Sequence, residues 1–227
     1  MHTENNFFNL IKKFGIQTKV ILYFHCLILF RGTDDSESGD SAPTRQNSPC
    51  SSTDSSLELD TCASKSYLVL NEVSVHRGVS SHLCNVDLFL EDRWITSVQG
   101  DGLVISTPTG STGYAVAAGA SVVHPQVPSI MITPICPHSL SFRPVIVPAG
   151  ANLKLKVSEN ARSSALLSFD GKGTVELEKG DVLLVRTSTH PTPCVCKSNP
   201  FDDWFDSLSE CLLWNSRLQQ KKLNTPK

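Results

Sequence analysis

The residues of this chain best suited to bind a ligand lie in one run, Gln99 to Ala120, with the sequence QGDGLVISTPTGSTGYAVAAGA. An aspartate between two glycines opens the run, a short apolar stretch (103–105) follows, and a loop of glycines and hydroxylated residues (106–112) comes next. A strand, a glycine loop and a helix start, in that order, can bring backbone N–H groups to a phosphate. The run has neither a GK[ST] ending nor a GxGxxG pattern, so the residues alone favour an ordinary loop that caps a helix.

The composition is that of a globular chain rather than a nucleic-acid binder. The 227 residues include 20 Lys and Arg against 22 Asp and Glu, for a net charge of −2, and 40% are hydrophobic. A chain of this kind can bury a core, but it lacks the basic excess that phosphate backbones require. We therefore expect no nucleic-acid partner.

The eight cysteines predict a reduced protein rather than a disulfide framework. Cys84, Cys136 and Cys211 lie in apolar runs, which predicts buried thiols. Cys194 and Cys196 form a C-x-C pattern instead of the paired C-x-x-C of a zinc site. This use of cysteine predicts an intracellular, cytoplasmic protein without a metal site.

The first 66 residues differ in character from the rest. Residues 1–32 contain an apolar run, Val20 to Phe30, that is shorter than the ~20 residues a membrane-spanning helix needs. A signal peptide is the alternative, but Arg31 follows at once and no cleavage site is evident. We expect an atypical apolar N-terminus without a fold of its own and no membrane partner. Residues 33–66 are rich in Ser, Thr, Asp and Pro, which predicts a disordered linker.

From Tyr67 onward, short β-type runs alternate with turn signals. The expected strands are 67–75, 83–90, 93–99, 103–105, 129–135, 145–147, 152–157, 165–169 and 182–187, with turns at 91–92, 170–173 and 178–181. Many short strands at close spacing favour an antiparallel β-sandwich. The predicted fold class is thus mainly β (α+β), with a short central helix after Gly113.

The last predicted element is a C-terminal helix. Asn199 and Pro200 supply a cap and a first-turn proline. Its apolar side chains recur at helical spacing: Phe201, Trp204, Phe205, Leu208 and Leu212. We expect this stripe to dock on the sheet, with a partner-binding helix as the alternative. Residues 221–227 are a predicted tail.

Four segments in order carry a resemblance to a known family. They are LNEVSVHRG (70–78), QGDGLVISTPTGSTGYAVAAGAS (99–121), VHPQVPSIMITPICPHSLSFRPVIVP (123–148) and SFDGK (168–172). Together they make residues 67–220 resemble the C-terminal, NAD-binding domain of NAD kinases of the animal type. That family uses ATP, with a divalent metal such as Mg²⁺, to phosphorylate the 2′-hydroxyl of the adenosine ribose of NAD and so form NADP. Its members act as homo-oligomers, and the resemblance implies the same here.

The resemblance also implies which residues contact NAD: Asn71, Glu72, Asp101, Thr109, Thr112, Gly113, Tyr114 and Asp170. Asn71 and Glu72 would bind the ribose and the adenine, for which an amide and a carboxylate are suitable groups. Asp101 would lie near the nicotinamide end. The adenine and ribose pocket would be lined by Thr109, Thr112, Gly113 and Tyr114. Asp170 would neighbour the bound substrate. Without the resemblance, Asn71, Asp101 and Asp170 are ordinary turn residues, and Tyr114 is an aromatic on a helix face.

The sequence departs from the family pattern in two places. The family run GSTAY is GSTGY here, because Gly113 replaces an alanine. The motif GGDGT, whose aspartate is thought to be the general base in the family, does not occur in these 227 residues. A ribose hydroxyl is a poor nucleophile without such a base. We therefore expect no catalytic residue in this chain and low or no kinase activity. The alternatives are a non-catalytic NAD-binding or regulatory subunit of a full-length NAD kinase, and an unstable fragment.

Overall fold

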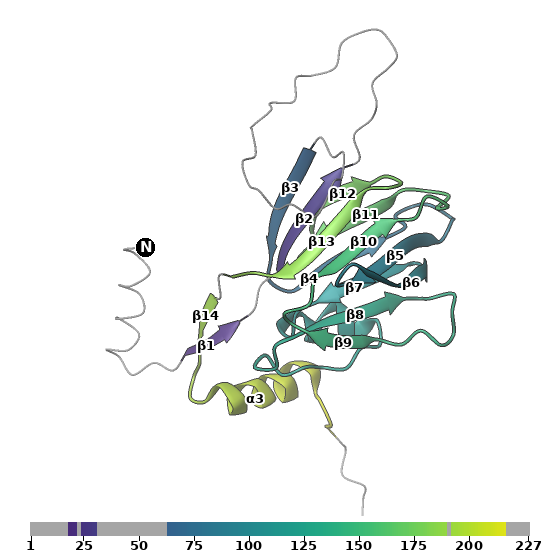
Figure 1. Ribbon diagram of the computed structural model, residues 1–227. Coiled ribbons are helices and arrows are strands. Elements are labelled where there is room, and N and C mark those ends of the chain that lie inside the picture. Colours follow the sequence, from purple (N-terminus) through teal and green to yellow (C-terminus); the bar gives the residue numbers. More distant parts are fainter. Residues whose placement is uncertain (1–17, 22–23, 31–62, 190–191, 217–227) are drawn as a thin grey trace, which may run out of the picture. The chain divides into compact units, whose positions relative to one another are not determined.

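The computed structural model describes residues 18–21, 24–30, 63–189 and 192–216, which divide into two compact units (Figure 1). The larger unit comprises residues 22–123 and 127–190, and the smaller one residues 1–21, 124–126 and 191–227. Among the described residues, no helix is both long enough and apolar enough to cross a membrane.

The larger unit is a β-sandwich of two antiparallel six-stranded sheets. The first sheet has the order β3 (Ala63–Val69), β2 (Phe24–Phe30), β13 (Val182–Thr187), β10 (Leu153–Val157), β5 (Cys84–Leu90) and β6 (Arg93–Gly100). The second has the order β12 (Lys172–Leu177), β11 (Ala165–Phe169), β4 (Glu72–His76), β7 (Gly102–Ser106), β8 (Ser129–Ile135) and β9 (Val145–Pro148). This confirms the predicted mainly β, sandwich-like fold class.

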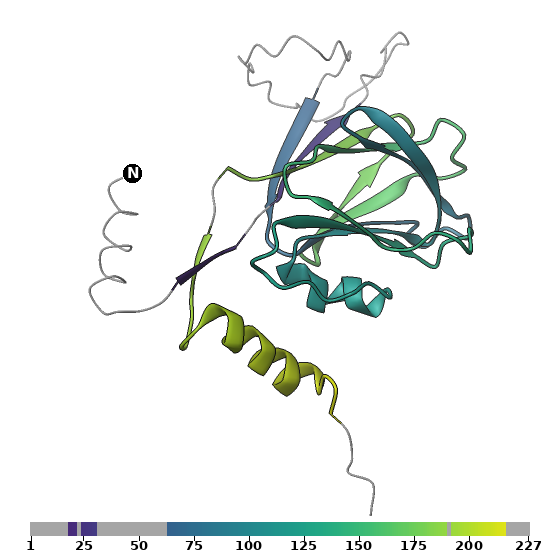
Figure 2. The same cartoon turned by 60° about the horizontal axis from the view of Figure 1, so that its bottom comes forward.

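The larger unit's two sheets can be followed as ribbons in Figure 2. Alternating side chains from both sheets form one hydrophobic core. In β10, Leu153, Leu155 and Val157 are buried while Lys154 and Lys156 lie at the surface. β5 and β11 alternate in the same way. Burying one apolar face of each sheet supplies the main stabilisation of such a sandwich.

A short helix covers part of the outer face of the second sheet. η1 (Thr109–Thr112) leads into α2 (Tyr114–Ala117), and Ala115 packs with Val104 of β7 and Met131 of β8. β7 is therefore buried on both faces, which explains its unbroken apolar sequence. The apolar cluster around Ala115 does not extend to the outer face of β4, which lies next to β7. That face of β4 is therefore available for a site.

Most predicted strands and turns match the structure, with two differences along β3, β4 and β12. The predicted strand 67–75 is two strands, because the chain breaks at Leu70 and Asn71 between the two sheets. β12 was not predicted as a strand, since its residues Lys172–Leu177 are mostly exposed and it lies at a sheet edge. The hairpin turn at 91–92 is confirmed, whereas the predicted turn 170–173 is shortened to 170–171 because β12 begins at Lys172. Glu91, Asp92 and Asp170 have positive φ angles of 50°, 60° and 49°.

The expectation that residues 1–32 have no fold of their own is wrong for residues 24–30. These residues form β2, which pairs with β3 on one side and β13 on the other. Phe24, Cys26 and Ile28 are fully buried in the core, so the apolar run is a central strand. The predicted linker 33–66 lies outside the described residues except for 63–66, which begin β3. The tail 221–227 also lies outside them, and the predicted domain boundaries stay predictions.

The prediction of buried thiols holds for Cys84 but is wrong for Cys136 and Cys211, which are exposed. Cys136 follows the end of β8 at a positive φ of 43°, and Cys211 lies on the solvent side of the C-terminal helix. Burial raises the pKa of Cys84 to about 11 and keeps that thiol protonated.

The smaller unit contains the C-terminal helix and a two-stranded ladder. β1 (Thr18–Ile21) pairs with β14 (Thr192–Val195), and α3 (Pro200–Leu212) begins after the predicted cap Asn199, whose side chain accepts a hydrogen bond from the Phe201 backbone N–H. Within this unit, the aromatic residues of α3 pack against the imidazole of His124. Docking of the helix on the sheet stays a prediction.

Candidate functional site

The outer face of β4 carries a row of polar side chains. Glu72, Ser74 and His76 alternate with Val73 and Val75, which point into the core. Because neighbouring side chains of a strand point to opposite faces, the three polar groups lie on one face. They form one wall of a surface groove.

The groove has a volume of about 440 Å³ and draws its lining from several elements. The lining residues are Glu72, Ser74, His76, Arg77, Gly78, Asp101, Tyr114, Ile135, Ser168 and Gly171. Three residues predicted from the sequence, Glu72, Asp101 and Tyr114, thus lie in one groove although they are distant in sequence. A groove of this size with converging polar groups is suited to part of a dinucleotide.

The turn at residues 70–72, which carries two predicted ligands, is held from one side by Asp170. The Asp170 carboxylate accepts hydrogen bonds from the backbone N–H groups of Leu70 (2.9 Å), Asn71 (2.7 Å) and Glu72 (3.2 Å). The Asp170 N–H donates in return to the Glu72 carbonyl at 2.9 Å. Asp170 therefore fixes the backbone from which the Asn71 and Glu72 side chains extend.

The glycine and threonine loop holds the same 70–72 turn from the other side. Thr107 donates through its backbone N–H to the Asn71 carbonyl (2.8 Å) and through its hydroxyl to the Leu70 carbonyl (2.7 Å). A Cβ on Gly110 would lie 2.2 Å from the Asn71 carbonyl oxygen, so only glycine permits this approach. The hydroxyls of Thr109 and Ser111 also bond within the protein, to Thr107 and Val123. The loop therefore supports the 70–72 turn.

Asp101 is oriented by an arginine that the sequence reasoning did not single out. The Arg77 Nε donates to Asp101 Oδ1 at 2.7 Å, and the Arg77 backbone N–H donates to the Asp101 carbonyl at 3.0 Å. The Arg77 guanidinium also bonds the Ser80 carbonyl. These bonds leave the second carboxylate oxygen of Asp101 available in a groove that is open to solvent.

Two groups in the groove have shifted pKa values. Burial, together with the nearby Asp170 charge, raises the pKa of Glu72. Burial and the nearby Cys136 and Asp101 raise the pKa of Tyr114, which keeps its phenol protonated. The groove therefore offers a phenol hydroxyl as a hydrogen-bond donor.

The eight predicted residues fall into three groups. Glu72, Asp101 and Tyr114 line the groove, and Asn71 and Asp170 adjoin it through the 70–72 turn. The remaining three, Thr109, Thr112 and Gly113, belong to the loop and are not among the groove's lining residues. Their contacts with NAD, like those of the other five, stay predictions.

The sequence reasoning missed four polar residues of the groove: Ser74, His76, Arg77 and Ser168. The signal for the first two is the alternation of polar and apolar residues in NEVSVHR, which places every second side chain on the face that carries Glu72. No pattern in the sequence pairs Arg77 with Asp101, because the contact depends on the pairing of β4 with β7.

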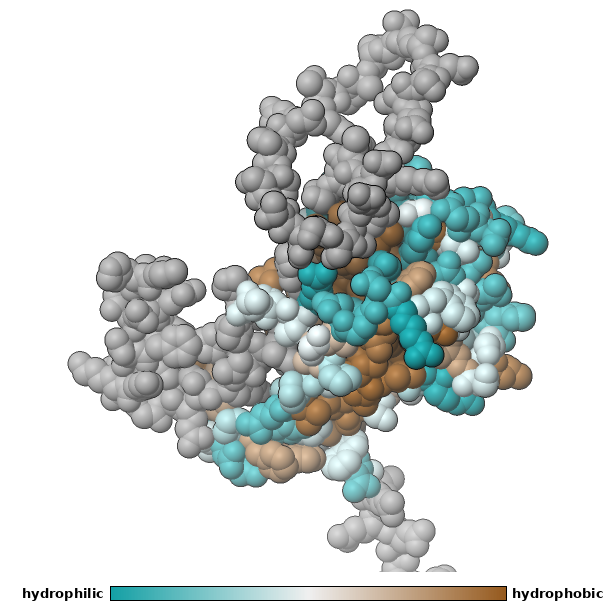
Figure 3. Space-filling model, viewed as in Figure 1, coloured by the Kyte–Doolittle hydropathy of each residue, from teal (hydrophilic) through white to brown (hydrophobic). Residues whose placement is uncertain are grey.

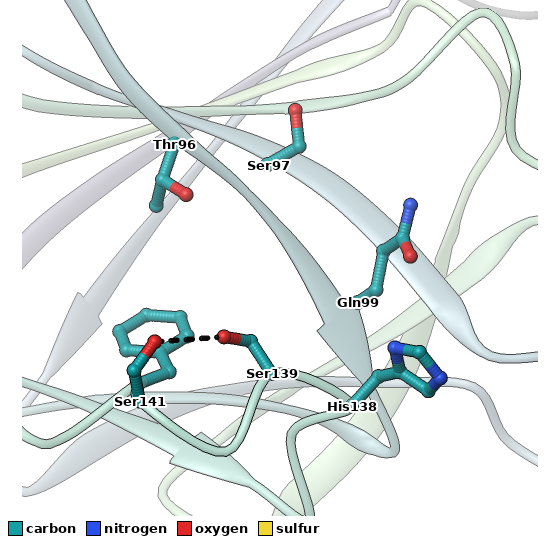
Figure 4. Close-up of a pocket in the computed structure, with 7 residues that line it drawn as sticks. Thr96, Ser97, Gln99, His138, Ser139 and Ser141 are labelled. Atoms are coloured by element: carbon teal, nitrogen blue, oxygen red, sulfur yellow. Dashed lines mark hydrogen bonds between the residues drawn. The ribbon is translucent and has the colours of Figure 1, made fainter.

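A second hollow, of about 320 Å³, lies between β6 and the loop after β8 (Figure 4). It is lined by Thr96, Ser97, Gln99, His138, Ser139, Ser141 and Phe142, and the hydroxyls of Ser139 and Ser141 are 3.1 Å apart. None of the eight predicted site residues lines it. It lacks carboxylates, so the groove beside β4 is the better candidate site.

The described residues do not supply a site for a resident metal ion. In the part of the chain that the structure describes, no three His, Cys, Asp or Glu side chains converge as metal ligands would. Of the nearby carboxylates, Asp101 bonds the Arg77 side chain through one oxygen, and Asp170 accepts backbone N–H groups.

Comparison with known proteins identifies the family. The family model of the ATP-NAD kinase C-terminal domain matches residues 70–196. The chain is 54% identical over 159 residues to NAD kinase 2, chloroplastic, of Arabidopsis thaliana, a match that covers 70% of this chain and 16% of the relative. It is 47% identical over 153 residues to NAD(+) kinase of Saccharomyces cerevisiae, covering 67% of this chain and 28% of that enzyme.

Comparison with solved structures points to the same family. The crystal structure of yeast NADH kinase complexed with NADH superposes with a TM-score of 0.73 at 30% identity, over 96% of this chain and 55% of that one. The chain spans well under two thirds of the length of these relatives. The match of sequence and fold over the sandwich places this chain in the NAD kinase family, as a C-terminal domain of that family.

Proposed function

We propose that this chain provides the NAD-binding part of an NAD kinase, the enzyme that phosphorylates NAD at the adenosine ribose 2′-hydroxyl with ATP to give NADP. The observation that carries the proposal is the groove that brings Glu72, Asp101 and Tyr114 together. A yeast structure of similar fold is complexed with NADH, which supports a dinucleotide as the ligand.

The residues of the groove would bind and orient the dinucleotide. Glu72 and Asn71 would accept and donate hydrogen bonds to the ribose and adenine, because the 70–72 turn holds their backbone in place. Asp101, oriented by Arg77, would accept a hydrogen bond at the nicotinamide end. The Tyr114 ring would cover the base or the sugar, and the threonine loop would support the pocket.

The chain alone would have low or no kinase activity. It contains no GGDGT motif and no other assigned general base for the 2′-hydroxyl. ATP, with Mg²⁺ bound to its phosphates, is the proposed co-substrate, as the family description of an ATP-NAD kinase supports. A cytoplasmic location and a homo-oligomer are further parts of the proposal. A non-catalytic subunit that associates with a full-length NAD kinase is the alternative.

An NADP assay tests the proposal. The purified chain would be incubated with NAD, ATP and Mg²⁺, and NADP would be measured alongside a full-length NAD kinase. We expect little or no NADP from this chain, together with measurable NAD binding. Turnover comparable to that of the full-length enzyme would contradict the proposal. Co-purification with the full-length enzyme, with a change in its activity, would favour the alternative.

A further inference from the structure

A histidine, His76, ends β4 and lines the groove beside Arg77. Hydrophilic side chains alone do not mark a ligand site on this protein, because Figure 3 shows them beside hydrophobic ones on the face that it presents. His76 is more informative than an ordinary polar residue, since a hydrogen bond decides which of its two ring nitrogens carries the proton.

The ring of His76 is held by the backbone of the next turn. The backbone N–H of Gly78 donates a hydrogen bond to Nδ1 of His76 at 3.2 Å. A ring nitrogen that accepts a hydrogen bond carries no proton, so the proton of the neutral imidazole is on Nε2. Gly78 has a φ of 61°, which favours glycine at this position of the turn. His76 therefore presents an Nε2–H donor to the groove that it lines.

Two serine hydroxyls accompany this donor on the same face. Ser74 lies two residues before His76 in β4, so their side chains point to the same side of the sheet. Ser168 of β11 lies directly opposite Ser74 in the β4–β11 ladder. Both serines line the groove, and a hydroxyl can donate a hydrogen bond. We call Ser74, His76 and Ser168 the donor row.

Carboxylates flank the donor row at both ends. Glu72 begins β4, before the donor row. Asp101 adjoins the other end, because it precedes Gly102, which is paired with His76 in the β4–β7 ladder, and it bonds the side chain of Arg77. A strand rises ~3.3–3.4 Å per residue, so β4 extends ~13 Å from Glu72 to His76. The groove thus has acceptors at its ends and neutral donors between them.

This order of groups matches a dinucleotide, which has a nucleoside at each end and a diphosphate in the middle. Ribose hydroxyls and base N–H groups donate to carboxylates, whereas phosphate oxygens need donors and are repelled by carboxylates. Among the lining residues, which all belong to the described part of the chain, Arg77 is the one lysine or arginine, and it is already bonded to Asp101. The donor row is therefore the part of the groove best suited to phosphate oxygens.

We propose that His76 binds the diphosphate of the dinucleotide through its Nε2–H, with the hydroxyls of Ser74 and Ser168 as further donors. The inference rests on the proposed function, because it takes a dinucleotide as the ligand of the groove. It adds a phosphate subsite that depends on one orientation of the His76 ring. His76 acts in binding and takes no part in phosphoryl transfer.

Nitrogen-15 NMR of the imidazole rings tests the orientation on the folded chain without nucleotide. The signals of His76 are identified by their loss in His76→Gln, and the buffer is alkaline enough to keep imidazoles neutral. We expect the proton of His76 on Nε2 and none on Nδ1. A proton on Nδ1 would overturn this inference and leave the proposed function unaffected.

Calorimetric titration with NAD tests the contact. His76→Leu removes the donor, whereas the amide of His76→Gln keeps one. We expect about tenfold or weaker binding by His76→Leu and binding within about threefold of the wild type by His76→Gln, because a hydrogen bond to a charged group is lost only in the first. His82→Leu is the matched control, since His82 is exposed and does not line the groove, and its NAD affinity should stay within about twofold of the wild type.

The outcomes of this titration separate the two proposals. Saturable NAD binding by the wild type, with equal affinity in His76→Leu, would overturn this inference alone. Absence of NAD binding to the folded wild-type chain would overturn the proposed function and this inference with it. Urea unfolding of each variant shows that the measured affinity is that of a folded chain.

Two smaller ligands locate the contact on the diphosphate. ADP-ribose keeps the diphosphate of NAD, and adenosine lacks it. His76→Leu should bind ADP-ribose about tenfold more weakly than the wild type and adenosine within about twofold of it. An equal loss of affinity for both ligands would place His76 at a nucleoside and overturn the inference.

Discussion

The Asp170 carboxylate lies 2.7 Å from the backbone nitrogen of Asn71, ninety-nine residues earlier in the chain, and accepts its hydrogen bond. The same carboxylate accepts the N–H groups of Leu70 and Glu72. A hairpin turn in one part of the sequence thereby fixes the turn that carries two candidate NAD ligands.

Asp170→Asn should destabilise the fold. An asparagine offers one acceptor oxygen where the carboxylate offers two, so at least one backbone N–H of the 70–72 turn loses its partner. A lost bond of this kind costs about 1–3 kcal/mol. Urea unfolding of the variant measures the loss.

Asp92→Asn is the matched control for this substitution. Asp92 also lies in a hairpin turn at positive φ, 60° against 49° for Asp170, and asparagine tolerates that conformation. Its partner is Lys154, in an ion pair whose aspartate is 77% exposed, so we expect a change below about 1 kcal/mol. Equal losses in the two variants would show that Asp170 does not hold the turn.

The glycine loop allows a second matched comparison. Gly110→Ala would place a Cβ 2.2 Å from the Asn71 carbonyl oxygen, so the loop must move away from the 70–72 turn. Gly113→Ala brings its Cβ no closer than 3.7 Å to the Gly110 carbonyl, an ordinary contact. We expect Gly110→Ala to cost about 2 kcal/mol or more and Gly113→Ala less than about 1 kcal/mol in thermal or urea unfolding. The opposite order would refute the close approach.

The raised pKa of Glu72 predicts that this residue makes the free energy of unfolding depend on pH. Burial, with the Asp170 charge, raises its pKa above the ordinary value of 4.5, so the native state holds the proton more tightly than the unfolded chain. Ionisation of Glu72 therefore costs stability as the pH rises from 4.5 through the raised pKa. Glu72→Gln removes that cost. The variant should unfold at higher urea than the wild type at neutral pH, and the difference should disappear below pH 4.5.

Glu91→Gln should change the free energy of unfolding in the direction opposite to Glu72→Gln. Hydrogen bonds from Asn152 lower the pKa of Glu91, so its ionised form stabilises the native state. That contribution is present above the ordinary pKa of 4.5 and is lost as the pH falls through the lowered value. Glu91→Gln should therefore weaken the fold at neutral pH but not in acid. A difference that stays constant with pH in either variant would contradict the assigned environments.

Arg77→Ala should weaken NAD binding more than it weakens the fold. Loss of the guanidinium leaves Asp101 without the bond that orients it, and we expect about a tenfold loss of NAD affinity, or ~1.4 kcal/mol. The two side chains are 33% and 38% exposed, so the effect on stability should be below about 1 kcal/mol. Calorimetric titration and urea unfolding separate the two effects.

Lys156→Ala is the control for Arg77→Ala, since it removes the surface ion pair of Lys156 with Glu159, whose atoms lie 3.1 Å apart. Neither residue lines the groove. We expect its NAD affinity to equal that of the wild type. If Arg77→Ala binds NAD as well as this control does, Asp101 has no role that depends on Arg77.

Much of the sandwich was predictable from local patterns. β8, β11 and β13 have the predicted bounds, because a Pro or Asp residue adjoins at least one end of each apolar run. The role of Phe24–Phe30 was not predictable in this way. A short apolar run that follows basic residues is also typical of targeting segments, and only its pairing with β3 and β13 identifies a central strand.

Some residues of the groove follow from the sequence. The hydrogen bonds that hold the groove together do not, because they join residues that are distant in sequence. The motif residues Glu72, Asp101 and Tyr114 meet in one groove, and their contacts with NAD stay predictions. The internal bonds of Asp170 and Thr107, by contrast, arise because the β11–β12 hairpin and the loop after β7 converge on the 70–72 turn. Local sequence does not reveal which of several turn-forming residues will hold another turn.

Titration of the purified, folded chain with NAD and with ATP, in separate calorimetric experiments, tests the central claim most directly. The account predicts saturable NAD binding, at least about tenfold weaker binding by Asp101→Asn, and unchanged binding by Gln99→Ala in the second hollow. It predicts no comparable binding of ATP. Absence of NAD binding to the folded chain, or equal NAD affinity in Asp101→Asn and the wild type, would contradict it.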